Sequence, residues 1–145
     1  MRFWDSSALV PLVVRQRASS PMRSLYRSDS GVIAWWGARV ECESAIARLA
    51  REGHLRRRAA AAARGRLDRF ADTWQEVQPV ESVREWARRL LRVHDLRAAD
   101  ALQLAAAMAA AEGRPPTLPF ACLDERLSAA AEREGFPVLG VAPDR

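Results

Sequence analysis

The sequence predicts an α/β fold, a three-layer sandwich with a central, mostly parallel sheet flanked by helices. Short apolar runs bounded by turn residues, typical of buried strands, alternate along the chain with longer segments of helical apolar spacing. Right-handed crossovers between such strands place their carboxyl ends along one rim. Ligands bind at that rim in folds of this kind, so we expect any site to lie there.

The first part of the chain predicts two strands separated by two short helices. Residues 2–5 are predicted to form a short buried strand, and a serine that follows can cap a helix over residues 7–15. The Ser-Ser-Pro sequence at 19–21 breaks that helix before a second one over 21–27. Residues 31–37 are apolar between two glycines and begin with β-branched residues, which indicates a central strand.

The middle of the chain predicts a helical hairpin. Apolar residues recur at helical spacing from 38 to 52, and Gly53 is a stop signal. A second, strongly basic helix follows over residues 55–73, so the two form an antiparallel pair. Residues 77–80 are either a short strand or an extended connector.

The last part alternates helices and strands again. One face of the segment 81–93 is apolar, whereas the segment 96–112 is apolar almost all round and is therefore the buried helix. Residues 118–123 are predicted to form a strand and 124–134 a helix that ends at a glycine. Residues 136–141 are predicted to form the last strand.

Length and composition limit the class of protein. A chain of 145 residues with 49% hydrophobic residues is expected to form one domain, residues 1–145, around one core. No apolar run approaches the roughly 20 residues that span a bilayer, and no secretory signal is visible. We therefore expect a cytoplasmic protein without a membrane association.

The cysteines and histidines do not predict a metal centre. Cys42 and Cys122 lack ligand spacing and are expected to be buried thiols, since a disulfide is unfavourable in a reducing compartment. The two histidines form no cluster with them, which argues against zinc.

The net charge of +5 favours a polyanionic partner. All 23 basic residues are arginine, whose planar fork binds phosphate and carboxylate groups bidentately. A GC-rich coding bias explains the absence of lysine, whereas the charge itself favours nucleic acid or an acidic protein.

Four carboxylates stand at the ends of apolar elements. They are Asp5, Glu41, Asp100 and Asp124. An ionised carboxylate is costly to bury unless a partner or a metal compensates for its desolvation. Four of them at one rim suggest an oxygen-only pocket for Mg²⁺ or Mn²⁺.

Three of the four carboxylates also have a structural explanation. Asp5 and Asp124 can cap the helices that follow them, and Asp100 can form a core salt bridge with Arg97 or an incoming arginine. Two nearby acids are weaker candidates: Glu43 is rotated away from the apolar stripe beside Glu41, and Asp95 precedes its helix as a cap.

The sequence around the acids resembles a known family. The matching stretches are residues 3–10, 39–45, 96–105 and 123–127, and Leu-Arg-Ala-Ala-Asp-Ala-Leu at 96–102 is the most specific. Together they resemble the PIN-domain ribonucleases, most closely the VapC-like toxins of bacterial toxin–antitoxin pairs. The resemblance spans nearly the whole chain and implies a PIN-like sandwich.

The resemblance implies a metal-dependent endoribonuclease in which the four acids hold Mg²⁺ or Mn²⁺. An ion of this kind activates water and stabilises charge on the phosphate, so no side chain need be the nucleophile. Ser7 matches a hydroxyl residue beside the first acid. Where many relatives carry Ser or Thr, this chain has Cys122, which can replace a hydroxyl only as a weaker hydrogen-bonding group. Candidate RNA-binding residues are Ser7, Arg39, Arg97 and Arg126.

The family also implies partners: an RNA substrate and an antitoxin whose C-terminal segment lies beside the basic hairpin of residues 38–73. A homodimer is expected as well. Leu67, Phe70 and Trp74 form a stripe on the second helix of that hairpin. The stripe must bury either against a partner or against the protein's own core.

Three alternatives remain open at this point. The chain can be a PIN-like module that binds RNA or protein without cleaving, or a DNA nuclease of similar fold, since arginine contacts to the backbone do not separate DNA from RNA. It can also be an interaction protein with exposed tryptophans as anchors, although core packing explains several tryptophans equally well.

Overall fold

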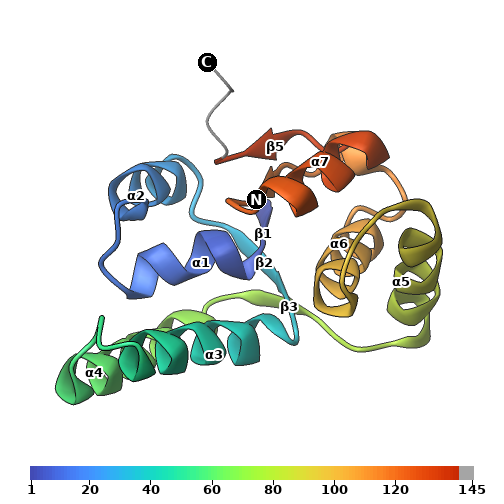
Figure 1. The fold of residues 1–145 in the computed structure, drawn as a ribbon. Helices are drawn as coiled ribbons and strands as arrows, with labels where there is room; N and C mark the ends of the chain where they lie inside the picture. Colours follow the sequence, from blue (N-terminus) through green and yellow to red (C-terminus); the bar gives the residue numbers. More distant parts are fainter. Residues whose placement is uncertain (141–145) are drawn as a thin grey trace.

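The computed structural model describes residues 1–140 and confirms the predicted α/β sandwich (Figure 1). Its sheet has five strands in the order β3-β2-β1-β4-β5, and every pairing between neighbours is parallel. The strands are β1 (Arg2–Trp4), β2 (Val32–Trp35), β3 (Gln75–Val77), β4 (Phe120–Ala121) and β5 (Val138–Leu139).

Helices cover both faces of this sheet. In Figure 1 the helices α1 to α4 lie on one side of the strands, and α5, α6 and α7 lie on the other. This division follows from right-handed crossovers, because the chain moves outward from β1 to β3 and then returns across the sheet to β4 and β5. The helices are α1 (Ser6–Val13), α2 (Ser19–Ser28), α3 (Ala38–Arg51), α4 (Arg57–Ala71), α5 (Glu81–Val93), α6 (Ala98–Ala110) and α7 (Glu125–Glu134), with a 3-10 turn at Pro115–Thr117.

The core forms where β1 and α6 meet the flanking layers. Phe3 and Trp4 of β1 are fully buried, and the ring of Phe3 stacks on Phe120 of β4 with centroids 5.3 Å apart. Most of α6 is buried, as its nearly continuous apolar sequence predicts. Small alanine side chains there let α5 pack closely along it. The carboxyl ends of the strands are thereby fixed in relation to the helices that follow them.

Several boundaries differ from the sequence prediction. The third strand lies at Gln75–Val77 rather than at 77–80, because Pro79 lacks the N–H that a ladder requires. Helix α4 begins at Arg57 rather than at residue 55, since Arg56 has an extended backbone. The last strand is Val138–Leu139, and Val141 of the predicted range lies outside the described residues.

The aromatic stripe on α4 packs on the protein's own core. Leu67 is fully buried and Trp74 is largely buried. The ring of Phe70 lies between Tyr26 and Trp74, with centroids 5.4 Å away in both cases. Of the two roles that the sequence allowed, the stripe therefore packs against the protein's own core rather than against a partner, and it gives no support to a dimer.

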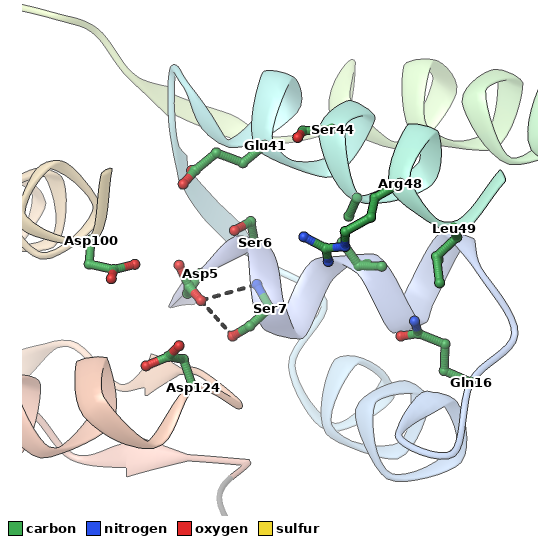
Figure 2. A pocket seen from close by; sticks show the side chains of 12 residues that line it. Asp5, Ser6, Ser7, Gln16, Glu41, Ser44, Arg48, Leu49, Asp100 and Asp124 are labelled. Carbon is green, nitrogen blue, oxygen red and sulfur yellow. Dashed lines mark hydrogen bonds between the residues drawn. The ribbon is translucent and has the colours of Figure 1, made fainter. Parts of the chain in front are cut away.

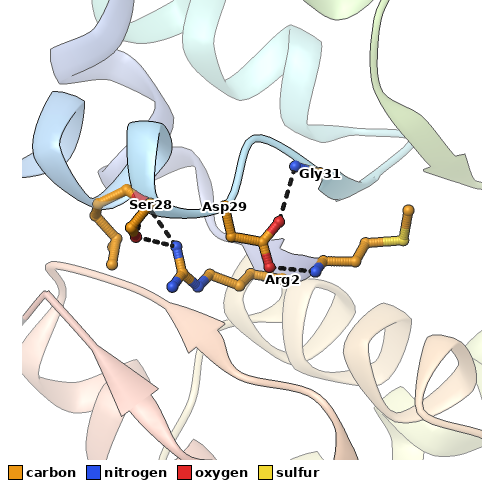
Figure 3. A network of polar contacts seen from close by, with 6 residues as sticks. Arg2, Ser28, Asp29 and Gly31 are labelled. Atoms are coloured by element: carbon orange, nitrogen blue, oxygen red, sulfur yellow. Dashed lines mark hydrogen bonds and ion pairs between the residues drawn. The ribbon is translucent and has the colours of Figure 1, made fainter.

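A polar network fixes the start of β1 against the loop that leads into β2 (Figure 3). Asp29 accepts hydrogen bonds from the N-terminal amine of Met1 and from the backbone N–H of Gly31. Arg2 donates to the carbonyl oxygen of Leu25 at 2.6 Å and to the hydroxyl of Ser28 at 3.0 Å. These bonds help to set the register of β1, the strand that precedes Asp5.

No helix within residues 1–140 is long and apolar enough to cross a membrane.

Candidate metal centre

The four predicted carboxylates line one cavity of about 410 Å³ at the carboxyl rim of the sheet (Figure 2). Asp5 follows β1, and Asp124 follows β4 as the N-cap residue of α7. Glu41 and Asp100 lie in the first turns of α3 and α6. Four elements from distant parts of the sequence therefore bring their acids together, as strand ends and helix starts in a parallel sheet should.

Asp5 both caps a helix and faces the cavity. Its Oδ2 accepts hydrogen bonds from the backbone N–H of Ser7 at 3.0 Å and from the Ser7 hydroxyl. Within the described residues no hydrogen bond from a backbone or side-chain donor reaches its Oδ1. Burial raises the pKa of Asp5, the bonds from Ser7 oppose this, and the charge of Asp100 raises it further.

Asp124 combines the same two roles. Its Oδ1 accepts from the backbone N–H of Leu127 at 2.8 Å, which caps α7. The carboxylate also lines the cavity opposite Asp5 (Figure 2). The capping explanation for these two aspartates is therefore correct, but it does not remove them from the site.

Glu41 is held by a glutamine that the sequence did not single out. The side-chain amide of Gln103 on α6 donates to Glu41 Oε2 at 2.6 Å. Burial raises the pKa of Glu41 to about 7, against the lowering effect of this hydrogen bond. Gln103 is fully buried, and its own carbonyl oxygen has no hydrogen-bond partner among the described residues. Such a fixed donor orients the carboxylate.

Asp100 does not form the core salt bridge with an arginine that would have explained its position without a metal. No arginine nitrogen in residues 1–140 comes within ion-pair distance of it. Burial and the charge of Asp124 raise the pKa of Asp100, and the opposing charges of Arg97 and Arg126 only partly offset this rise. The Asp100 carboxylate is thus repelled by the neighbouring acid Asp124 and has no direct cationic partner in the described residues.

Of the three arginines predicted to bind RNA, two lie beside the cavity and one does not. Arg97 and Arg126 are exposed beside the cavity and act on Asp100. Arg39 turns away from it, and its guanidinium bonds Asp68 at 2.9 Å and lies 3.7 Å from Asp72 on the neighbouring helix. Arg39 is therefore engaged in the α3–α4 hairpin.

The rear wall of the site connects two strand ends through Ser7. Its hydroxyl donates to Asp5 and accepts from the backbone N–H of Leu123 at 2.9 Å. The Cys122 sulfur lies 3.7 Å from the Ser7 hydroxyl and 3.7 Å from Asp5 Oδ2. Burial raises the pKa of Cys122 to about 12, so the group remains a thiol and a weak donor. Both cysteines are buried and free, as predicted.

The donor set fits a hard divalent cation. All four acids offer oxygen, and three of them have raised pKa values without an ion-pair partner in the described part of the chain. Oxygen ligands of this kind suit Mg²⁺ and Mn²⁺. No three acidic, histidine or cysteine side chains within residues 1–140 already converge as a metal-binding group, so binding would require the carboxylates to draw together.

Sequence reasoning missed several residues of the cavity wall. Arg48 and Ser44 lie on α3, and Gln16 follows α1. The signal for the first two was present, because residues three and seven positions after Glu41 share its helical face. Nothing in the sequence indicated Gln16.

Comparison with known proteins agrees with this architecture. The parallel sheet with an acidic carboxyl rim defines a PIN-like fold, and the chain superimposes on the crystal structure of FitAcB from Neisseria gonorrhoeae. The TM-score is 0.66 at 17% sequence identity, over 95% of this chain and 96% of that one. This likeness concerns the fold alone.

Two curated relatives identify the family. The chain is 32% identical over 139 residues to ribonuclease VapC45 and to ribonuclease VapC49, from two strains of Mycobacterium tuberculosis. Each alignment covers 94% of this chain and 92% of the relative. No family model matches the chain. At this identity and coverage, the chain belongs to the VapC family of PIN-domain ribonucleases.

Proposed function

We propose that the protein is a metal-dependent endoribonuclease that hydrolyses RNA phosphodiester bonds. The observation that carries the proposal is one cavity lined by Asp5, Glu41, Asp100 and Asp124, in which three carboxylates are partly desolvated without a direct cation partner. An added divalent cation would stabilise such a cluster. The relatives named ribonucleases support RNA as the substrate.

The four acids would hold Mg²⁺ or Mn²⁺, and the bound ion supplies an activated water and stabilises charge on the phosphate. The chain's own residues prepare this site. Ser7 orients Asp5, and Gln103 orients Glu41 through its amide. The Cys122 thiol is buried and protonated, so it does not serve as a nucleophile. Arg97 and Arg126 stand beside the cavity, where they can bind the RNA backbone.

The direct test combines purified protein with labelled RNA and with DNA of the same sequence, each with Mg²⁺, with Mn²⁺ or with EDTA. Cleavage of RNA that requires the metal supports the proposal. Binding without cleavage would favour the silent module, and equal cleavage of DNA would favour the nuclease of broader specificity. Sequencing of RNA ends after pulsed expression would then identify the target.

We also propose that the protein is the toxin of a toxin–antitoxin pair and acts in the cytoplasm. Membership in the VapC family supports this role. The partner would be an antitoxin whose C-terminal segment lies beside the hairpin of α3 and α4, with an inserted arginine or lysine that competes for the site carboxylates. Co-expression with the neighbouring gene should relieve toxicity and yield a co-purifying complex. Failure of both results would contradict the partner.

A homodimer is the last part of the proposal. Trp36 is 49% exposed and Val40 66% exposed, and both line a surface hollow where α3 begins. Exposed apolar groups that lie together favour a protein partner, and a two-fold dimer would bury like surfaces against each other. Light scattering at micromolar concentration tests it, since a monomer mass that does not change with concentration would contradict the dimer.

A further inference from the structure

The cavity extends beyond the four carboxylates into a second part between α1 and α3. We call this part the distal arm and define it by Gln16, Ser44, Arg48 and Leu49, all of which line the same cavity as the acids. Figure 2 shows the arm leading away from Glu41, with the Arg48 guanidinium and the Gln16 amide directed into the space between the helices. Its polar groups are a cation and neutral donors, in contrast to the acidic part.

Helix geometry places Arg48 on the cavity side of α3. Seven residues separate it from Glu41, which returns the side chain to nearly the same face about 10 Å further along the axis. A long side chain on a helix also leans toward the N-terminus, which for Arg48 means toward Ser44 and Glu41. The guanidinium therefore lies between Gln16 at the far end of the distal arm and the acids (Figure 2).

Among the arginines of the hairpin, Arg48 is the one within residues 1–140 that both lines the cavity and lacks a protein partner. Arg39 pairs with Asp68, Arg64 pairs with Glu43 at 2.9 Å, and Arg66 donates twice to the carbonyl of Val13. Within residues 1–140, no ion pair or hydrogen bond engages the Arg48 side chain. Its fork of donors remains available to a ligand of the cavity.

We propose that the distal arm binds a backbone phosphate of the RNA strand next to the phosphate that is cleaved. This inference rests on the proposed function and specifies how the substrate is held. Arg48 is the charged ligand, because a guanidinium fork matches two phosphate oxygens. The Ser44 hydroxyl and the Gln16 amide are neutral donors on either side of it.

The arrangement also solves an electrostatic problem of the site. Four carboxylates repel a polyanion, and a cation at the acidic end would neutralise only the phosphate that it contacts. The guanidinium of Arg48, whose backbone lies about 10 Å further along α3 than that of Glu41, attracts the strand where it leaves the acids. The cation held by the carboxylates and the Arg48 guanidinium thus bind different phosphates of the same strand.

The test measures RNA binding in the Asp100→Asn background, with fluorescence anisotropy of a labelled, mixed-sequence single-stranded RNA over a range of KCl concentrations. Arg48→Gln should weaken binding about tenfold, as expected for loss of a charge-assisted hydrogen bond. It should also reduce the slope of log affinity against log salt by about 0.7, the value for one phosphate on a single strand. Arg48→Lys should keep the slope and lose part of the affinity.

Arg51→Gln is the matched control, because Arg51 is an exposed arginine on the same helix that does not line the cavity. It should leave affinity and slope near those of the parent. In the cleavage-competent protein, Arg48→Gln should raise KM and keep most of kcat. Equal effects of Arg48→Gln and Arg51→Gln on binding and KM would overturn the subsite.

The proposed function can fail separately. If the protein with Mg²⁺ cleaves no RNA while Arg48→Gln still weakens binding more than Arg51→Gln, the ribonuclease proposal fails and the subsite stands. If cleavage is present and the two arginine variants behave alike, the subsite fails and the ribonuclease stands. If the RNA does not bind at all, both are overturned.

Discussion

Two regions of the molecule hold carboxylates in partly desolvated surroundings, and they solve the problem of that charge differently. In the first region, where the end of α7 meets α5, the Glu134 side chain is 9% exposed and lies 2.7 Å from both Arg89 and His94. In the second, the acidic cavity at the carboxyl rim of the sheet, Asp5 is 3% exposed and has no cation within ion-pair distance in the described residues.

The pKa values follow this difference. Burial alone would raise the pKa of Glu134, but hydrogen bonds and charge from Arg89 and His94 lower it overall. In the cavity, burial and like charges raise the pKa values of Asp5, Glu41 and Asp100. The comparison teaches that a protein cation keeps a largely buried acid ionised in the fold, whereas a cluster of acids without one is suited to an external cation.

The largest effect should come from removing one of the unpaired acids. Asp100→Asn is expected to reduce RNA cleavage at least about a hundredfold, because metal catalysis contributes several kcal/mol and about 1.4 kcal/mol corresponds to a factor of ten. Asp5→Asn, Glu41→Gln and Asp124→Asn should act similarly. The metal-free fold of Asp100→Asn should be as stable as the parent or more so, since repulsion is relieved. Cleavage rates and thermal melts measure both.

Two neighbouring acids provide the controls for that series. Glu43 is exposed and pairs with Arg64, and Asp95 is exposed outside the cavity. Glu43→Gln and Asp95→Asn should therefore keep near-parental activity. Full activity of Asp100→Asn would contradict the site, and an inactive Glu43→Gln beside an active Glu41→Gln would move the ligand to Glu43.

The pH dependence of stability should differ between the two regions. The folded pKa of Glu41 is raised from 4.5 to about 7, so the folded state binds more protons in that interval and metal-free stability should fall as pH rises through it. The lowered pKa of Glu134 has the opposite sign, since its contribution is lost as pH falls through the folded value. Melting curves between pH 4 and 8 measure the sum of these two contributions to stability.

Adding a divalent metal to the same melting experiments separates the contribution of the cavity acids from that of Glu134. Mg²⁺ should recover the stability that is lost toward pH 7, because it compensates the ionised carboxylates. The recovery should be absent in Asp100→Asn. A stability that is equal at pH 5 and pH 7, with and without Mg²⁺, would remove the electrostatic distinction between the two regions.

A smaller effect is expected from the paired region. Glu134→Gln should cost about 1 to 3 kcal/mol of unfolding free energy, since it leaves the largely buried His94 and the exposed Arg89 without their anion. Cleavage per folded molecule should not change. Chemical denaturation measures the loss, and Glu132→Gln is the control because Glu132 is an exposed acid on the same helix. A stability equal to that of the control would show that the pairing contributes nothing.

The smallest effect concerns the amide that orients Glu41. Gln103→Leu should reduce kcat about tenfold, the scale seen when a group that orients a metal ligand is removed. Stability should hold or rise, because the variant also removes the buried carbonyl oxygen that has no partner in residues 1–140. Gln103→Met controls for side-chain length. Unchanged kcat in both variants would make the hydrogen bond irrelevant to the site.

Much of the fold and the positions of the acids could be predicted because the signals are local. Strand ends, caps and helical spacing placed Asp5, Glu41, Asp100 and Asp124 at one rim, and the structure brings all four to one cavity. The strand Gln75–Val77 was harder to locate, because this edge strand is short and mostly polar.

The features that could not be predicted from the sequence depend on contacts between distant segments. The sequence could not show that Arg39 would be taken by Asp68 of α4, that Gln103 of α6 would reach Glu41, or that Arg48 would be left without a partner. Each outcome requires the packing of helices separated by many residues. The same holds for the Phe70 stripe, which the sequence could assign equally to a partner or to the core.

The most direct test of the central claim is calorimetric titration of the purified protein with Mn²⁺ at pH 7.5, compared with Asp5→Asn, Asp100→Asn and the Glu43→Gln control. If the four carboxylates form the metal site, the parent and Glu43→Gln should bind Mn²⁺ with the same affinity, and the two aspartate variants should bind it at least about tenfold more weakly. Equal Mn²⁺ affinity in all four proteins, or no binding by the parent, would contradict the account.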